Sequence, residues 1–180
     1  KKAEINSIRL NLKADFSKLS SLDEQENFLD SASRIFTHII QNTIIPYWYD
    51  TKWDFNGYTE KPRNGNIACG YFVSTTLRDM GLNLNRYRMA QQSGTSEGQT
   101  IACSNPKNIF DIVLRGDKTI ESYLQNLKNG LYFVGLDNHV GFVLIVNNQY
   151  YFIDSNYIEL KVTKQETNKS DSFRSSRYYF

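Results

Sequence analysis

The chain has 180 residues, with 21 lysines and arginines against 19 aspartates and glutamates, so its formal net charge at pH 7 is +2. So small a charge, without a basic run, argues against a nucleic-acid partner, because phosphate binding needs a concentrated positive surface. Residues 39–45 form the longest apolar stretch, which polar residues interrupt and which is far below the roughly 20 residues of a membrane span. We therefore expect no membrane span.

Two cysteines, Cys69 and Cys103, are too few for a disulfide framework, and no Cys/His spacing matches a zinc site. We expect no metal and no cofactor. The chain starts with Lys1 rather than Met, which suggests that an export signal or a tag has been removed. An exported location, periplasmic or extracellular, is the corresponding expectation.

Residues 1–20 show no clear period and are interpreted as an N-terminal extension, in which residues 5–12 are compatible with a short edge strand. Residues 21–180 are interpreted as a single domain. Ser21 and Glu24 have the spacing of a capping box, and apolar residues then recur every three or four positions up to Ile40. This pattern predicts a helix that ends before Pro46, because the proline ring disfavours a preceding helical turn.

Residues 47–65 are predicted to form an aromatic-rich loop that lines a cleft. A second helix is predicted over residues 68–80, with Gly81 just after its end and Cys69 in its first turn. Residues 83–106 are polar, and two short helical patterns follow at 108–114 and 119–128, the second ending at Gly130.

The period then changes to that of strands, at residues 131–136, 139–146, 149–154 and 157–162. Asn147 and Asn148 connect the second and third of these strands, and both residues tolerate positive φ, so a tight antiparallel hairpin is expected. The simplest topology is a meander. Residues 163–175 are predicted to be a mobile loop, and residues 177–180 an edge strand.

The residues with the clearest chemical potential are Cys69, His139 and Asp154, in that order along the chain. A cysteine in a first helical turn lies near unpaired backbone N–H groups and the positive end of the helix dipole, which favour thiolate. A histidine can stabilise the thiolate and protonate a leaving amine, while a carboxylate fixes the orientation of the ring. This is the composition of an acyl-transfer triad.

The predicted hairpin makes the last pair geometrically plausible. A two-residue turn at Asn147 and Asn148 places position 139 opposite about position 156, so that Asp154 is a near neighbour of His139. Because the register carries an error of a residue or two, Asn156 is the alternative orienting group. The backbone N–H of Cys69 is expected to donate one hydrogen bond to an oxyanion. The other is expected from Trp53, Asn56 or Tyr58, all three in the predicted loop at 47–65.

Two segments carry a family resemblance: IACGYFVSTTLRDMGLNLNR at 67–86 and NHVGFVLIVNNQYYFIDSN at 138–156. They resemble the nucleophile helix and the histidine hairpin of papain-like cysteine hydrolases, and in particular of bacterial cell-wall amidases of the NlpC and CHAP type. Tyr58 resembles the upstream tyrosine of the NlpC group. Two departures are that Asp154 stands where many such enzymes have a second histidine, and that no glutamine lies shortly before Cys69.

Less specific interpretations of the same residues remain open. Cys69 can also be interpreted as a small buried apolar residue without catalytic function. The aromatic side chains of the loop can likewise be interpreted as part of the hydrophobic core. Cys103 is interpreted as structural or exposed, and His38 as packed or half-exposed. A further group lies after the nucleophile helix and would either meet a substrate carboxylate or form a solvated loop: Arg86, Arg88, Gln91 and Gln92.

Together these observations predict an α+β fold, papain-like and NlpC-like by resemblance, in which N-terminal helices pack on a mainly antiparallel sheet. The expected reaction is hydrolysis of a peptide amide through a thioester, on a peptide or a peptidoglycan-like substrate. A transglutaminase-type acyl transferase and a catalytically silent binding module are the two alternatives.

Overall fold

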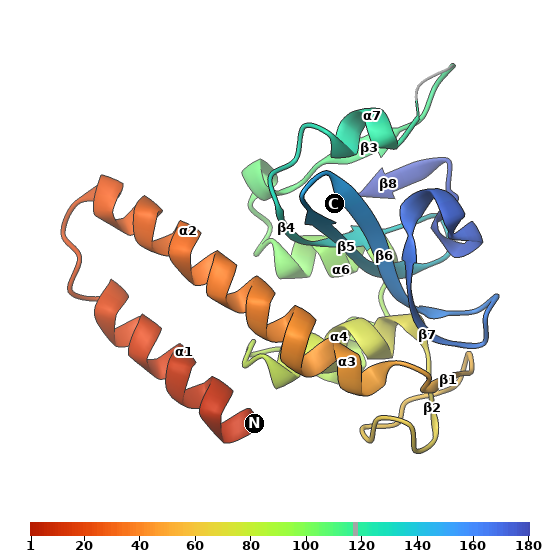
Figure 1. Ribbon diagram of the computed structural model, residues 1–180, viewed down its shortest axis with the longest axis horizontal. Helices are drawn as coiled ribbons and strands as arrows, with labels where there is room; N and C mark the ends of the chain where they lie inside the picture. The colour runs from red at the N-terminus through yellow and green to blue at the C-terminus, as the bar shows by residue number, and fades with distance from the viewer. Residues whose placement is uncertain (117–118) are drawn as a thin grey trace.

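The computed structural model describes residues 1–116 and 119–180, which form helices packed on a mixed, mostly antiparallel sheet (Figure 1). The α-helices are α1 (Lys2–Phe16), α2 (Leu22–Ile39), α3 (Ile45–Trp48), α4 (Cys69–Asp79), α5 (Arg86–Ala90), α6 (Gly94–Ile101) and α7 (Glu121–Leu124). Shorter helical segments are the π-helical η1 (Ile40–Ile44) and the 3₁₀ turns η2 (Pro106–Asn108), η3 (Thr167–Lys169) and η4 (Asp171–Phe173). No helix in this described part is long and apolar enough to cross a bilayer.

The eight described strands form one sheet in the order β2-β1-β7-β6-β5-β4-β8-β3. Their bounds are β1 (Lys52–Trp53), β2 (Asn66–Ile67), β3 (Asp111–Val113), β4 (Gly130–Gly135), β5 (Val140–Val146), β6 (Gln149–Asn156), β7 (Lys161–Glu166) and β8 (Arg177–Tyr179). Strands β4 to β7 follow one another as the predicted antiparallel meander. The α+β class is therefore confirmed.

The β5–β6 hairpin has the predicted turn and register. Asn147 and Asn148 have φ values of 50° and 60°, the conformation of a two-residue turn that matches the twist of the strands. Val146 pairs with Gln149 and Phe142 with Ile153. This register brings the end of β6 alongside the start of β5.

Both faces of the central strands are covered, which explains why β5 is apolar without interruption. Phe142 and Leu144 belong to a core shared with α4 and the end of α2. Val143 and Ile145 point to a second core, which is completed by Phe173 from the C-terminal segment. The nucleophile helix predicted at 68–80 is α4, with Gly81 at a φ of 94° after its end.

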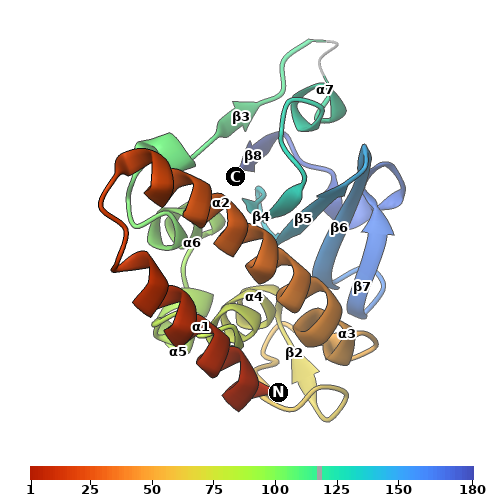
Figure 2. The same cartoon turned by 60° about the vertical axis from the view of Figure 1, so that its left-hand side comes forward.

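The N-terminal region differs from the prediction. Residues 1–20 contain the helix α1 rather than an edge strand, because Ile5, Ile8 and Leu12 fall on one helical face toward α2. The predicted capping box of Ser21 and Glu24 is present at the start of α2. Figures 1 and 2 show α1 and α2 as a helical hairpin whose turn lies away from the sheet.

The predicted helix, α2, ends at Ile39, before Pro46 as predicted, but the helical backbone does not end there. After α2 the backbone passes through the π-helical η1 and continues into α3, where Pro46 occupies one of the first two positions. A proline is tolerated there because its missing N–H would have no partner in the first helical turn. The loop predicted at 47–65 is confirmed from Tyr49 onward, apart from the short strand β1.

Between residues 83 and 130 the structure contains elements that the sequence did not predict or predicted with other bounds. The polar segment 83–106 contains α5 and α6, which begin after the side-chain caps Asn85 and Ser93. The segment predicted as a helix at 108–114 contains the strand β3, because it pairs with β8 far along the chain. The helix predicted at 119–128 is reduced to α7, and Gly130 begins β4 instead of ending a helix.

The C-terminal part is more ordered than the sequence indicated. The fourth predicted strand is β7, which begins at Lys161 because the chain first turns through Leu160 at a φ of 56°. Residues 163–175 are not a loop: they continue β7 and then form η3 and η4, where Phe173 is buried. The strand β8 lies between β4 and β3, so it is not at the edge.

Candidate active site

Cys69 is the first residue of α4 and is half-buried. No side chain caps this helix, since its N-cap residue is Ala68, so the N–H groups of the first turn face the space around the sulfur. The preceding segment is held on both sides: the N–H of Ala68 donates to the Gly57 carbonyl at 2.8 Å, and the Ser155 hydroxyl donates to the Ile67 carbonyl at 2.7 Å. These bonds fix where the helix starts.

His139 lies immediately before β5, in the turn that connects it to β4. The Leu136 N–H donates to the His139 carbonyl at 2.8 Å and closes this turn. The imidazole is 6% exposed and its Nε2 lies 2.8 Å from Oδ2 of Asp154. The ring lies nearly perpendicular to those of Phe152 and Tyr157, at centroid distances of 5.9 and 5.1 Å. The ring is thus held in one orientation.

Asp154 is fully buried in β6, and hydroxyl groups complete its hydrogen bonds. Ser172 Oγ donates to Oδ2 at 2.8 Å, and Thr163 Oγ1, from the facing residue of β7, donates to Oδ1 at 3.2 Å. A buried carboxylate is tolerated when it is paired and hydrogen-bonded in this way. Sequence analysis missed Ser172, because nothing local distinguishes it from the neighbouring serines.

Cys69 and His139 line the same cleft, and each affects the protonation of the other. Because Nε2 of His139 is taken by Asp154, only the Nδ1 side of the imidazole is free to interact with Cys69, which lines the same cleft. Burial alone would raise the pKa of the Cys69 thiol, but His139 and the N–H groups of Val140 and Gly70 outweigh it, so this pKa is lowered. Burial opposes protonation of His139, yet Asp154 and Cys69 raise the pKa of the imidazole to about 9. The two shifts together favour a thiolate–imidazolium pair at neutral pH.

The pair opens into a cleft with a volume of about 980 Å³. Its walls include aromatic side chains from the loop after α3, from α4 and from the segment after β6: Trp53, Phe55, Tyr58, Tyr71 and Tyr157. The proposed oxyanion donors Trp53, Asn56 and Tyr58 all line this cleft, and their role as donors stays a prediction. Trp48, in contrast, is only 2% exposed and belongs to the core, so the aromatic run serves both purposes.

The alternative orienting group, Asn156, is engaged elsewhere. Its amide donates to Ser172 Oγ at 2.8 Å, and its Oδ1 accepts from the N–H groups of Ile158 and Glu159, each at 2.8 Å. Asn156 therefore supports Ser172, which in turn holds the carboxylate of Asp154. Of the two candidates, Asp154 is the one hydrogen-bonded to His139.

The remaining candidates lie apart from the pair. Cys103 is exposed after α6, with a φ of 50°. His38 is exposed near the end of α2, and its Nδ1 lies 3.1 Å from Nδ2 of Asn42. Gln91 and Gln92 line the cleft, whereas Arg88 is exposed.

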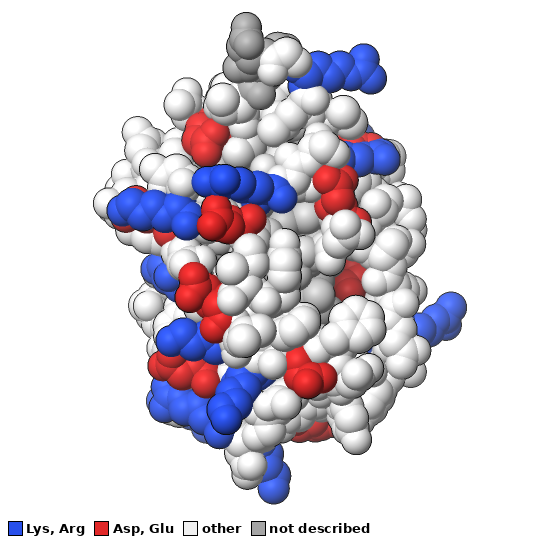
Figure 3. Space-filling model, turned by 90° about the vertical axis from the view of Figure 1, so that its right-hand side faces the viewer, with Lys and Arg blue, Asp and Glu red and all other residues white. Residues whose placement is uncertain are grey.

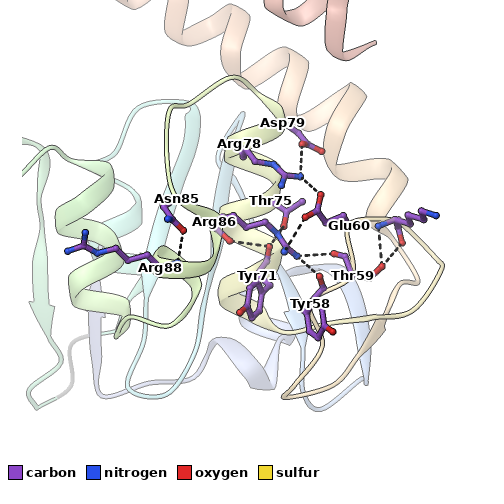
Figure 4. A network of polar contacts seen from close by, with 12 residues as sticks. Tyr58, Thr59, Glu60, Tyr71, Thr75, Arg78, Asp79, Asn85, Arg86 and Arg88 are labelled. Atoms are coloured by element: carbon purple, nitrogen blue, oxygen red, sulfur yellow. Dashed lines mark hydrogen bonds and ion pairs between the residues drawn. The ribbon is translucent and has the colours of Figure 1, made fainter.

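Arg86 does not reach into the cleft as a carboxylate-binding group. It is 3% exposed and donates to the carbonyls of Tyr58 and Thr59, at 2.6 and 3.0 Å, and to Thr75 Oγ1 at 2.6 Å (Figure 4). Its guanidinium also lies over the ring of Tyr71, 4.7 Å from the centroid. Arg86 thus ties the aromatic loop to α4, and it positions the wall that carries Tyr58.

Comparison of the chain with protein-family models, with curated proteins and with solved structures gives no match. The case for a function therefore depends on the geometry of the site alone.

Proposed function

We propose that this protein is a cysteine hydrolase with a papain-like fold, which cleaves a peptide amide through a thioester intermediate. The observation that carries the proposal is that His139, which is hydrogen-bonded to Asp154, lines the same large open cleft as Cys69 and lowers the pKa of its thiol. The order and the environment of these three groups match those of a nucleophile, a base and an orienting carboxylate.

In the first half of the reaction, the Cys69 thiolate attacks the carbonyl carbon of the substrate amide. A carbon–sulfur bond forms, and the negative charge moves to the carbonyl oxygen, near the N–H groups at the start of α4. When the oxyanion collapses, the carbon–nitrogen bond breaks and the imidazolium of His139 gives its proton to the leaving amine. The product of this step is a thioester on Cys69 and a neutral imidazole.

In the second half, water takes the place of the amine. Neutral His139 accepts a proton from this water as its oxygen attacks the thioester carbon, and Asp154 stabilises the imidazolium that forms. The carbon–sulfur bond then breaks, which releases a carboxylic acid and restores the ion pair. The proton that His139 gives to the amine in the first half is replaced by the proton that it takes from water in the second.

The cleft suits a peptide better than a highly charged polymer. Its walls combine flat aromatic faces with hydroxyl and amide groups, which is typical of sites for uncharged or weakly charged organic ligands. On the face of the molecule shown in Figure 3, basic and acidic side chains lie next to one another, without a broad patch of one sign. Peptidoglycan stem peptides are the substrate class that the resemblance adds, and an exported location would follow from it.

The proposal is tested by alkylation with iodoacetamide at pH 7, followed site by site with mass spectrometry. Cys69 is expected to react at least ten times faster than Cys103, because its thiol is ionised more readily. His139→Ala should slow Cys69 by about tenfold or more and leave Cys103 unchanged, whereas the control His38→Ala should change neither rate. Equal and slow labelling of both cysteines would contradict the proposal and favour a silent binding module.

A second measurement separates hydrolysis from acyl transfer. A panel of peptide amides, including muropeptides, is incubated with the protein in the presence and absence of a primary amine, and the products are identified by mass spectrometry. A hydrolase yields the free acid in both cases. Transfer of the acyl group to most of the added amine would instead identify a transglutaminase-type enzyme.

A further inference from the structure

A second, smaller cavity adjoins the cleft at Cys69, with a volume of about 220 Å³. It shares Cys69, Gly70 and His139 with the large cleft, so the two cavities meet at the proposed nucleophile. It is also lined by Ala90, Gln92, Ser93 and Gly94, by the turn before β5, and by Glu97 from α6. A group bound here would lie directly beside the reacting bond.

Glu97 is the unusual residue of this cavity, because it is 1% exposed and its side chain makes no hydrogen bond to the described part of the chain. Its Oε2 is buried with no partner among the described residues. The cap of α6 is provided by Ser93, whose Oγ accepts from the Ser96 N–H, so Glu97 is not needed there. Buried polar groups are nearly always satisfied, which makes an unsatisfied carboxyl at a cavity wall a candidate for ligand binding.

Glu97 also lies very close to the nucleophile. A side-chain carbon added to Gly70, the residue after Cys69, would be only 2.8 Å from Oε1 of Glu97 and 2.7 Å from the Ala90 carbonyl. Glycine at position 70 therefore allows α4 to approach the carboxyl. The other titratable residues that line the cavity are Cys69, Asp137 and His139.

The carboxyl of Glu97 is uncharged at neutral pH. Burial, with a smaller contribution from the negative charge of Cys69, raises its pKa to about 9. At pH 7 only about one molecule in a hundred would carry the ionised form. A neutral carboxyl offers one O–H donor and one carbonyl acceptor along the same edge.

The donor and the acceptor of the neutral Glu97 carboxyl favour some ligand groups over others. A primary carboxamide has an N–H donor and a carbonyl acceptor on one edge, so it can pair with a neutral carboxyl through two hydrogen bonds. A trans peptide bond cannot, because its N–H and its carbonyl point in opposite directions. An ammonium group would require Glu97 to ionise and would place a second negative charge next to the Cys69 thiolate, which raises the free energy of that state.

We propose that the cavity beside Glu97 receives a primary carboxamide of the substrate, such as the side chain of a glutamine or an asparagine next to the scissile bond. This inference rests on the proposed function, since it assigns part of the substrate of the same site. Glu97 would act in recognition, as a group that binds the substrate without taking part in bond breaking.

Two small alkylating reagents of the same shape test the inference, because each carries its recognition group one carbon away from the sulfur that it modifies. Chloroacetamide carries a carboxamide, whereas chloroacetone replaces its amide nitrogen with a methyl group. The rate at Cys69 is divided by the rate at the exposed Cys103 of the same molecules, which removes the intrinsic difference between the reagents. The quotient for chloroacetamide over that for chloroacetone then reports recognition of the amide.

The wild-type protein is expected to prefer chloroacetamide by about 5- to 10-fold, as one to two hydrogen bonds would give. Glu97→Gln keeps a neutral donor and acceptor on one edge and should retain the preference. Glu97→Met keeps the approximate size, removes both groups, and should reduce the preference to about one. Circular dichroism of both variants checks that they fold.

The outcomes separate the two proposals. If chloroacetone labels Cys69 no faster than Cys103, the proposed function is contradicted and the inference falls with it. If Cys69 is reactive but the wild type treats the two reagents alike, or Glu97→Met keeps the preference, only the inference is overturned. A wild-type preference for 2-bromoethylamine that Glu97→Gln abolishes would show that an ionised Glu97 binds cations, and would also overturn it.

Discussion

The central hairpin β5–β6 and the N-terminal helical hairpin α1–α2 each consist of two regular elements joined by a short connection, but they are buried to very different extents. Six of the seven residues of β5 are buried, whereas α2 has no buried residue and α1 has only Ile5. An apolar groove of about 340 Å³ remains between the two helices. Amphipathic pattern therefore does not measure how much a segment contributes to the core, and substitutions should affect the two regions unequally.

The largest effect is expected for Phe142→Ala in β5. Phe142 is 1% exposed, and its ring packs edge-on against Phe72 of α4 at a centroid distance of 6.0 Å. Truncation should lower the free energy of unfolding by about 3–5 kcal/mol, from lost burial and from the cavity left behind. Urea unfolding at pH 7 measures this change. A loss below about 1 kcal/mol would mean that the sheet and α4 are much less tightly packed than described.

The second-largest effect is expected for Asp154→Asn, at the carboxylate of the same hairpin. In Asp154→Asn the carboxylate that raises the pKa of His139 is lost, so this pKa should fall well below about 9. The thiolate of Cys69 then loses its cationic partner, and its alkylation at pH 7 should slow by about tenfold. Nuclear magnetic resonance titration of His139 and labelling of Cys69 check the two steps separately. The control Asp171→Asn, at an exposed carboxylate, should change neither.

A smaller effect is expected for Glu97→Gln, and it depends on pH. Because the pKa of Glu97 in the folded protein is raised to about 9, the unfolded chain loses this proton at lower pH than the folded one. The free energy of unfolding of the wild type therefore decreases as pH rises from the ordinary glutamate pKa toward 9.

Glutamine does not ionise, so Glu97→Gln should escape this loss. For each pH unit in this range its melting temperature should rise relative to that of the wild type by roughly 3–6 °C, which corresponds to about 1.4 kcal/mol per unit for a chain of this length. The difference should vanish near pH 4. Glu26→Gln, at an exposed position of α2, is the matched control. A difference that does not change with pH would show that Glu97 is not held in its neutral form.

The smallest effect is expected in the helical hairpin. Leu29 on α2 is 55% exposed and lines the apolar groove. Leu29→Ala should change the free energy of unfolding by less than about 0.5 kcal/mol, as is usual for exposed positions. Labelling of Cys69 should stay at the wild-type rate. A cost comparable to that of Phe142→Ala would show that the groove is covered in solution, for example by a second copy of the chain.

Local signals explain what the sequence predicted correctly. The capping box of Ser21 and Glu24, the helix that begins at Cys69 and the two-residue turn at Asn147 and Asn148 each depend on residues a few positions apart. The turn also set the register, and with it the contact between His139 and Asp154. The sequence was sufficient to predict these three features because residues close together in the chain determine their conformation.

The predictions of local structure were wrong where contacts with distant parts of the chain determine the conformation. Residues 111–113 form a strand because β8 pairs with them, and Ser172 is ordered because it donates to Asp154 from 18 residues away. Glu97 lay in a polar segment whose burial depends on α4 and the turn before β5. Periodicity carries no information about such long-range contacts.

The chain separation of the three central groups has a consequence for folding. His139 and Asp154 are 15 residues apart and belong to one tight hairpin, so closing the loop between them costs little chain entropy. Cys69 comes from 70 positions before His139, and α4 must dock onto the sheet before the sulfur meets the imidazole. We expect the histidine–aspartate pair to form early and the nucleophile to join late. A partly folded chain would then expose an ordinary, weakly reactive thiol and acquire its reactivity only with the last step of assembly.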